Sequence, residues 1–302
     1  MDFPISSVTI SPLLLAGIGF LVGILGGFFG VGGGFIADPL MFWAGVPMNF
    51  VVGTDLAHMT GKSIVAARRH RALGHVDIKL GLVMVMGTVL GVESGAQILE
   101  ALEVADVADI VIGLVYVVIL LGISAFTAWE SLRALRMIGN DRLSVQDALG
   151  FEGAARRIQS ITLPPMVSFP ASGIASISLW IVLGVGYLTG LLAGALGVGG
   201  GFIRMPMLVY AVGIPTHVAV GTDLFEIVIS ASFGTITHAI KGNVDVLMAL
   251  VMHTGAALGA QIGAVSTRFF AGPRIRLLFS ALPLLGALMV LIRLLSGGTI
   301  HF

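Results

Sequence analysis

The chain has 302 residues, of which 57% are hydrophobic and 11% are charged, and its mean hydropathy is +1.04. Soluble proteins average about 25% charged residues, so this composition excludes an ordinary soluble domain and is typical of a polytopic membrane protein. The 16 basic and 16 acidic side chains balance, which gives no indication of a nucleic-acid partner, and without cysteine there are no disulfides or thiolate metal sites.

The first half of the chain is predicted to contain four long helices and one short one. The N-terminus has no basic region and no small-residue cleavage site, so the first apolar run, 11–30, is expected to be a span rather than a signal peptide. It ends in a glycine-rich stretch, and the apolar segment 35–45 that follows makes only about 16 Å of helix, half of a bilayer core. Further helices are predicted at 49–68, 76–99 and 106–132.

The second half is predicted to repeat this order after a polar segment. Arginines and acids alternate between 133 and 170, and prolines end the segment, so we expect a solvated cytoplasmic linker over 133–172. Helices are then predicted at 173–197, 202–213, 217–238, 244–266 and 275–295. The expected domains are a first transmembrane repeat over 1–132, the linker, and a second transmembrane repeat over 173–302.

One stretch of sequence occurs twice without change. Residues 30–36, Gly-Val-Gly-Gly-Gly-Phe-Ile, return as residues 197–203, and Val-Gly-Thr-Asp-Leu at 52–56 returns at 220–224. We therefore predict an all-α polytopic membrane protein with two homologous repeats of about four transmembrane helices, each with a glycine-broken helix and a short half-helix. If the short segments fold back without crossing the membrane, each repeat has four spans and the repeats are parallel, which we expect. If they cross the membrane, each repeat has five spans and the repeats are inverted.

Three consecutive glycines should break a helix part-way through the membrane. The next helical segment then begins with unpaired N–H groups and a positive dipole end, which together suit an anion. The alternative is that the glycines only allow tight packing. Four-residue spacing of small residues elsewhere, as in Gly19, Gly23 and Gly27, already serves close helix packing, so we favour binding.

At these motifs the chain resembles the TauE/SafE sulfite exporter family, also called the 4-toluene sulfonate uptake permeases. The resemblance rests on the glycine motifs at 30–34 and 197–201, each followed by a proline, Pro39 or Pro206, and on the later Gly-Thr segments. It covers nearly the whole chain except the linker. Asp55 and Asp223 stand where the family commonly has serine. The resemblance implies transport of sulfite, sulfonates or other organosulfur anions across a bacterial inner membrane.

Two basic side chains are candidates for anion binding. Arg204 follows the second glycine motif directly, and Lys62 lies mid-helix, four residues after His58 and so on the same face. For each, the alternative is a side chain that extends to the membrane surface. The residues expected to bind substrate are Gly32, Gly33, Gly34, Phe35, Thr54, Lys62, Gly199, Gly200, Gly201, Phe202, Arg204 and Thr222.

Four further residues are candidates for coupling transport to protons. His58 aligns with Glu226, and either could exchange a proton near neutral pH or instead form a structural hydrogen bond. Asp55 aligns with Asp223, and we expect these acids to cap helices or to pair with Arg204 or Lys62. Glu93, which aligns with Gln261, and His253 are further candidates for buried polar residues, and structural pairing is the expectation for each.

The sequence predicts a secondary transporter that moves a small sulfur-containing anion by alternating access, with export favoured over uptake. A passive anion channel and a membrane protein that only scaffolds or senses are the alternatives. No catalytic constellation, metal spacing or cofactor motif is present in the sequence, so an enzyme is not expected. The expected partners are the small anion and the lipid bilayer, and a homodimer is left open.

Overall fold

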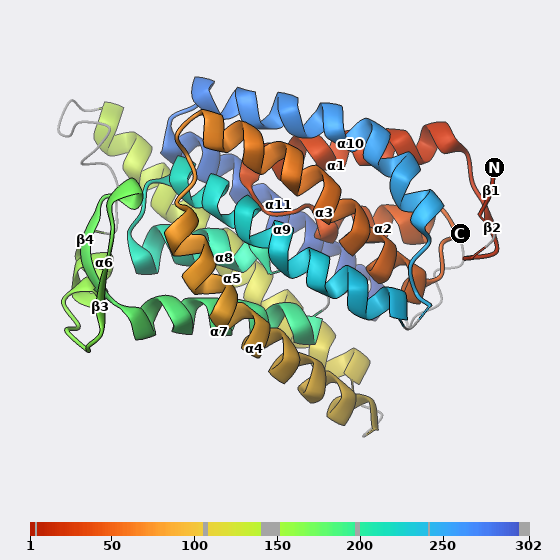
Figure 1. Ribbon diagram of the computed structural model, residues 1–302, viewed down its shortest axis with the longest axis horizontal. Coiled ribbons are helices and arrows are strands. Elements are labelled where there is room, and N and C mark those ends of the chain that lie inside the picture. The colour runs from red at the N-terminus through yellow and green to blue at the C-terminus, as the bar shows by residue number, and fades with distance from the viewer. Residues whose placement is uncertain (4, 105–107, 140–151, 197–199, 241, 296–302) are drawn as a thin grey trace.

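The computed structural model describes residues 1–3, 5–104, 108–139, 152–196, 200–240 and 242–295. Two short hairpins, β1 (Asp2–Phe3) with β2 (Val8–Thr9) and β3 (Met166–Phe169) with β4 (Ile174–Ser178), accompany a helical bundle (Figure 1). The helices are α1 (Pro12–Phe29), α2 (Gly34–Trp43), α3 (Met48–Ala72), α4 (Ile78–Val104), α5 (Ala108–Gly139), α6 (Glu152–Gln159), α7 (Leu179–Leu196), α8 (Gly201–Met207), α9 (Thr216–Ile240), α10 (Val246–Ser266) and α11 (Gly272–Leu295).

The chain is an all-α multi-pass membrane protein. Within the residues that the structure describes, five stretches are helical, long enough and apolar enough to cross a bilayer: 12–29, 78–95, 117–136, 216–240 and 246–269. Large apolar side chains cover the outside of the bundle, as a surface in contact with lipid requires. Examples are Leu13, Leu90, Val118, Ile236, Leu250 and Leu258.

Glycines interrupt the first helix where the sequence predicts. α1 ends at Gly30, and Gly30, Gly32 and Gly33 all have positive φ angles, a conformation that favours glycine. In the second half, α7 ends at Leu196. Gly200, which has a φ angle of 61°, immediately precedes α8. The rest of that motif, residues 197–199, lies outside the described residues.

The short helix α2 folds back along α1 instead of continuing across the molecule. Ile10, which precedes α1, and Val46, which follows α2, are buried in one apolar cluster with Leu15 and Met41. α1 and α2 therefore begin and end at the same end of the bundle, where β1 and β2 also lie (Figure 1). Only α3, α4 and α5 then run the length of this half, which is an odd number of crossings.

Small residues bring two pairs of helices into backbone contact. A Cβ atom built at Gly23 of α1 would lie 2.5 Å from the carbonyl oxygen of Ala256 in α10, and one built at Gly27 would strike Ala260. Gly87 and Gly91 of α4 meet the backbone of α7 in the same way. The four-residue glycine spacing thus serves close packing, as predicted.

Helices from matching parts of the two sequence copies are antiparallel. Gly53 at the start of α3 lies against Asn243 beyond the end of α9, and Gly221 at the start of α9 lies against His75 beyond the end of α3. On the outer pair, Ser124 of α5 donates a hydrogen bond to the carbonyl oxygen of Ser280 in α11. The expectation of parallel halves is therefore wrong. It counted the first helix as a crossing, whereas α2 returns the chain to the end at which α1 begins, so that α3, α4 and α5 make three crossings.

The antiparallel arrangement gathers the basic side chains at one end of the bundle. His75, between α3 and α4, stacks near His217 at the start of α9, with 5.2 Å between ring centroids. His217 Nε2 lies 3.1 Å from the carbonyl oxygen of Thr267, just after α10. The arginines at 68–71, 268 and 274 therefore share this end, which is also the end of β3, β4 and α6 (Figure 1).

Two element boundaries differ most from the sequence prediction. α5 continues to Gly139, since its last turns have no helix breaker and Arg133 and Arg136 are exposed. Residues 166–178 form the β3–β4 hairpin, so α7 begins at Leu179 and not at residue 173. The hairpins also hold helix caps: Ser172 donates to Asp77 at the start of α4, and Ser6 donates to Asp245 at the start of α10.

Candidate functional site

A group of ionisable side chains lies against the first glycine break. The lysine cluster consists of Asp38 on α2 and Asp55, His58 and Lys62 on α3, and all four are buried. His58 Nδ1 is 3.1 Å from Asp55 Oδ1, and Asp38 is close enough to interact electrostatically with Asp55 and Lys62. Because ionisable side chains are rare and costly away from water in a membrane helix bundle, this group is a candidate functional site.

The glycines of the break make room for this cluster. A Cβ atom built at Gly33 would lie 3.3 Å from Lys62 Nζ, and one built at Gly34 would lie 2.9 Å from Asp55 Oδ2. Lys62 is only 2% exposed and, among the described residues, its Nζ atom has no hydrogen-bond partner. Lys62 therefore does not extend to the surface, and its ammonium group lies at the start of α2.

A second set of ionisable side chains lies beside the second glycine break. The arginine cluster consists of Arg204 on α8 with Asp223 and Glu226 on α9, all fully buried. Arg204 Nη1 donates to Asp223 Oδ1 at 2.8 Å and to Glu226 Oε2. The pairing of Asp223 with Arg204 agrees with the sequence prediction. Arg204 itself is 1% exposed, so it is not a side chain at the membrane surface.

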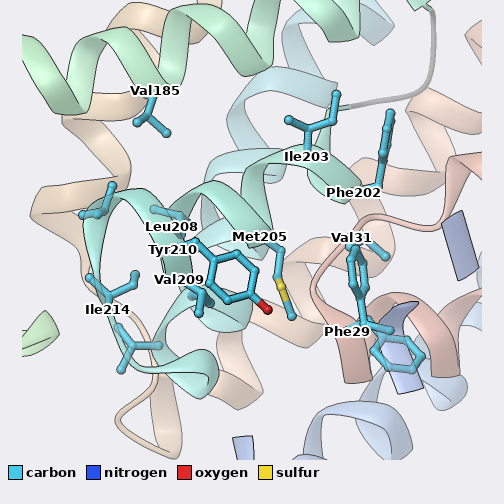
Figure 2. Packing of buried hydrophobic residues seen from close by; sticks show 14 of the residues in the cluster. Phe29, Val31, Val185, Phe202, Ile203, Met205, Leu208, Val209, Tyr210 and Ile214 are labelled. Carbon is cyan, nitrogen blue, oxygen red and sulfur yellow. The ribbon is translucent and has the colours of Figure 1, made fainter. Parts of the chain in front are cut away.

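The structure brings the two glycine breaks together at the centre of the bundle. A Cβ atom built at Gly201 would lie 2.9 Å from the backbone of Val31, and one built at Gly30 would lie 2.7 Å from Val220 of α9. Figure 2 shows Phe29 and Val31 on the side of α8 that carries Phe202 and Met205. The breaks and both clusters therefore occupy one buried region.

Apolar side chains separate the two clusters within this region. Met59 of α3 and Ile227 of α9 are neighbours of His58 and Glu226 in sequence and pack together in one small cluster. Gly32 lies against both, since a Cβ atom there would strike Met59 and lie 3.3 Å from Ile227. A change in the angle between α3 and α9 would move both clusters relative to the first break.

The hydroxyl groups of Thr54 and Thr222 are used to anchor helices. Thr54 Oγ1 accepts a hydrogen bond from the backbone N–H of Asp245, and Thr222 Oγ1 accepts one from that of Asp77, both at 3.0 Å. Each threonine holds the residue immediately before a helix from the other half. Sequence reasoning assigned these hydroxyl groups to substrate.

The remaining predicted residues are placed as follows. Glu93 and Gln261 are exposed, whereas half-buried His253 lies against Gly61 of α3, close to the lysine cluster. Gly199 is outside the described residues, and the side chain of Phe35 is not described. Phe202 is buried in the main apolar cluster.

Sequence reasoning missed two residues of the site. Asp38 was not among the predicted site residues, although a lone acid in a short apolar segment is itself a signal of buried charge. Thr189 of α7 lies 3.4 Å from Arg204 Nε and extends the arginine cluster to a third helix. No group of three or more His, Asp or Glu in the described part of the chain is arranged to hold a metal ion.

A separate set of histidines lies at the basic end. His70 Nε2 is 2.9 Å from the carbonyl oxygen of Gly27, in the last turn of α1, and His70 Nδ1 is 3.3 Å from His75 Nδ1. Partial burial, followed by the neighbouring His217, lowers the pKa of His75 below its ordinary value. These rings link the end of α1 to the α3–α4 connection.

The family profile described as "Sulfite exporter TauE/SafE" matches residues 15–290. The chain belongs to the TauE/SafE family. This is a family of membrane transporters, a class distinct from enzymes. A "Probable membrane transporter protein YunE" of Bacillus subtilis (strain 168) is 27% identical over 85% of this chain and 88% of its own length. No solved structure matches the chain significantly.

Two other relatives of this TauE/SafE protein bear the same kind of name. A "Probable membrane transporter protein" of Methanocaldococcus jannaschii is 24% identical over 93% of this chain and 95% of its own. One of Xylella fastidiosa (strain Temecula1) is 38% identical over 38% of this chain and 44% of its own. The similarity to the first of them extends over nearly the whole length of both chains.

Proposed function

We propose that the protein is a secondary transporter that moves a small sulfur-containing anion, such as sulfite or a sulfonate, by alternating access. The observation that carries the proposal is the Lys62 ammonium group, which is buried beside the start of α2 and has no hydrogen-bond partner in the described part of the chain. The first turn of α2 presents N–H groups that have no acceptor within the helix, together with the positive end of the helix dipole. A tetrahedral or pyramidal oxyanion matches this combination of a cation and backbone donors.

The two halves of the bundle are proposed to be inverted repeats. The antiparallel pairs α3 with α9 and α5 with α11 support this relation, as do the exchanged anchors of Thr54 and Thr222. Inverted repeats with broken helices at their interface are a common architecture of transporters that work by rocking one part against another. The α3–α9 crossing is the proposed pivot.

The arginine cluster is assigned to coupling and not to direct anion binding. Two carboxylates already accept from Arg204, so its charge is more than cancelled. Lys62 has neighbouring acids too, but its Nζ atom remains without a bonded partner. Glu226 and His58, with Asp55 and Asp223, are the proposed proton-exchanging groups.

Export is the proposed direction. The family's description as sulfite exporter supports it, and a negative-inside membrane potential favours outward movement of an anion by about 2.3 kcal/mol per charge per 100 mV. A passive channel is the second candidate, and it differs in having flux that does not saturate. The protein is proposed to reside in the cell inner membrane.

Thermal unfolding of the purified protein tests the choice of substrate. A bound anion stabilises the folded state by about 2.7 kcal/mol at a hundred times its Kd. We expect sulfite, thiosulfate, sulfonates or sulfoacetate to raise the melting temperature, and simple carboxylates to do so less. Lys62→Gln should abolish the shift, while Glu93→Gln, which changes an exposed carboxylate, should keep it. If the anion raised the melting temperature of Lys62→Gln as much as that of the wild type, Lys62 would not be part of the binding site.

A further inference from the structure

Both clusters contain more acid than base. The lysine cluster has one basic side chain, Lys62, against two carboxylates, Asp38 and Asp55. The arginine cluster likewise has one basic side chain, Arg204, against Asp223 and Glu226. With every carboxyl group ionised, each cluster carries one uncompensated negative charge. Both clusters therefore have the same charge balance, one basic side chain against two carboxylates, although different residue types occupy the aligned positions.

Neighbouring helices do not supply the missing charge. α1, which packs along the lysine cluster, and α7, which packs along the arginine cluster, have no acidic or basic side chain. His58 and, from α10, His253 are the other titratable groups facing Lys62, and each is neutral unless it takes up a proton. Thr189 and Ser230, which contact the arginine cluster, are uncharged. An isolated negative charge in such surroundings costs several kcal/mol.

Unpartnered oxygen atoms mark where a positive charge is lacking. Within the described residues, Asp38 Oδ1 in the lysine cluster has no hydrogen-bond partner, nor do Asp223 Oδ2 and Glu226 Oε1 in the arginine cluster. All three atoms are buried, and their residues are at most 6% exposed. A buried carboxylate oxygen without a partner is costly, and a bound proton or cation removes that cost.

We infer that each cluster binds one exchangeable monovalent cation, a proton or Na⁺, so that the protein has two such sites, one beside each glycine break. In the lysine cluster the cation is held by Asp38, Asp55 and His58; in the arginine cluster it is held by Asp223 and Glu226. The role in transport rests on the proposed function: an anion can approach Lys62 once the excess negative charge nearby is cancelled. Release of the cation would expel the anion.

Thermal unfolding without any substrate tests the inference, so failure of the proposed function would not affect the result. In buffer with choline as the cation, the melting temperature of the wild type should fall by several degrees between about pH 6.5 and 9, because the stabilising protons are lost as the pH rises. If Na⁺ is the natural occupant, NaCl at pH 9 restores the melting temperature and choline chloride at equal ionic strength does not. If the proton is the occupant, only lower pH restores it.

Substitutions assign the effect to the two clusters. Asp38→Asn and Glu226→Gln each remove one excess negative charge, so each should reduce the decrease in melting temperature at high pH. The double variant Asp38→Asn/Glu226→Gln should show no such decrease. The double variant Asp38→Asn/Lys62→Gln again has one excess negative charge in the lysine cluster, so its melting temperature should again depend on pH. This variant therefore distinguishes an effect of the charge balance from local structural damage. Glu93→Gln should behave as wild type. A wild type insensitive to both pH and Na⁺, or a double variant with the full wild-type dependence, would overturn the inference.

Discussion

Among single residues, Arg204 shows how ion-pair partners change the interpretation of a buried cation. Taken alone, an Arg beside a glycine break predicts an anion site, and its removal would weaken anion binding without unfolding the protein. In the structure it holds Asp223 and Glu226, so its removal leaves two buried carboxylates with no cation. Loss of Arg204 is therefore expected to destabilise the fold as well as any anion site.

We predict that Arg204→Gln lowers the free energy of unfolding by about 3–5 kcal/mol, the usual cost of breaking a buried pair. Arg204→Gln/Glu226→Gln removes one of the stranded carboxylates as well and should recover part of that loss. Thermal unfolding of both variants in detergent measures the difference. An Arg204→Gln protein as stable as the wild type would show that water or lipid headgroups already compensate the acids.

At the scale of elements, the glycine sequence determines both where helices break and where they meet. Three glycines in a row predict the interruption after α1, because Gly30, Gly32 and Gly33 take backbone angles that other residues avoid. Four-spaced glycines predict close packing, but not the partner. That α1 packs against α10, and α4 against α7, depends on contacts between the two halves of the chain, which no local pattern encodes.

Two glycines of α1 provide a matched test of this packing. Gly23→Ala places a methyl group 2.5 Å from the carbonyl oxygen of Ala256 and should force α1 and α10 apart. Gly17→Ala has no atom within 4 Å and should be neutral or stabilising by up to about 1 kcal/mol, as alanine favours helix. We expect a lower melting temperature only for Gly23→Ala; equal melting temperatures would mean that the α1–α10 contact is looser than described.

At the scale of the whole molecule, antiparallel halves account for a charge distribution that parallel halves leave unexplained. Residues 68–71 and the turn at 268–276 are both basic, and parallel repeats would place them on opposite sides of the membrane. The structure brings both to one end, together with α6 of the linker. Because Lys and Arg in short loops face the cytoplasm, we assign that end to the cytoplasmic side.

Much of this architecture could be predicted from the sequence, and the reason for the remainder is physical. Apolar length located the helices, and the duplicated motifs located the breaks and the charged residues on α3 and α9. Strand pairs such as Phe3 with Val8 are too short to leave a periodic pattern, so both hairpins were missed. The partners of Arg204, Thr54 and Thr222 lie on other helices, and no local pattern encodes those contacts.

The absence of cysteine from the sequence makes the orientation simple to test. Arg71→Cys and Arg268→Cys, each the only cysteine of its variant, should both be protected from a membrane-impermeant maleimide in intact cells and react in inverted vesicles. Gly45→Cys, at the opposite end of the bundle, should show the reverse pattern. Labelling of Arg71→Cys and Arg268→Cys from opposite sides would restore the parallel arrangement.

If an anion crosses the membrane through the lysine cluster, sulfite flux into proteoliposomes must depend on Lys62. We expect the initial rate to saturate with sulfite concentration, to depend on the pH gradient, and to fall at least about tenfold in Lys62→Gln, equivalent to about 1.4 kcal/mol of lost stabilisation, while Glu93→Gln keeps the wild-type rate. A rate that rises linearly without saturation, or one unchanged in Lys62→Gln, would contradict it.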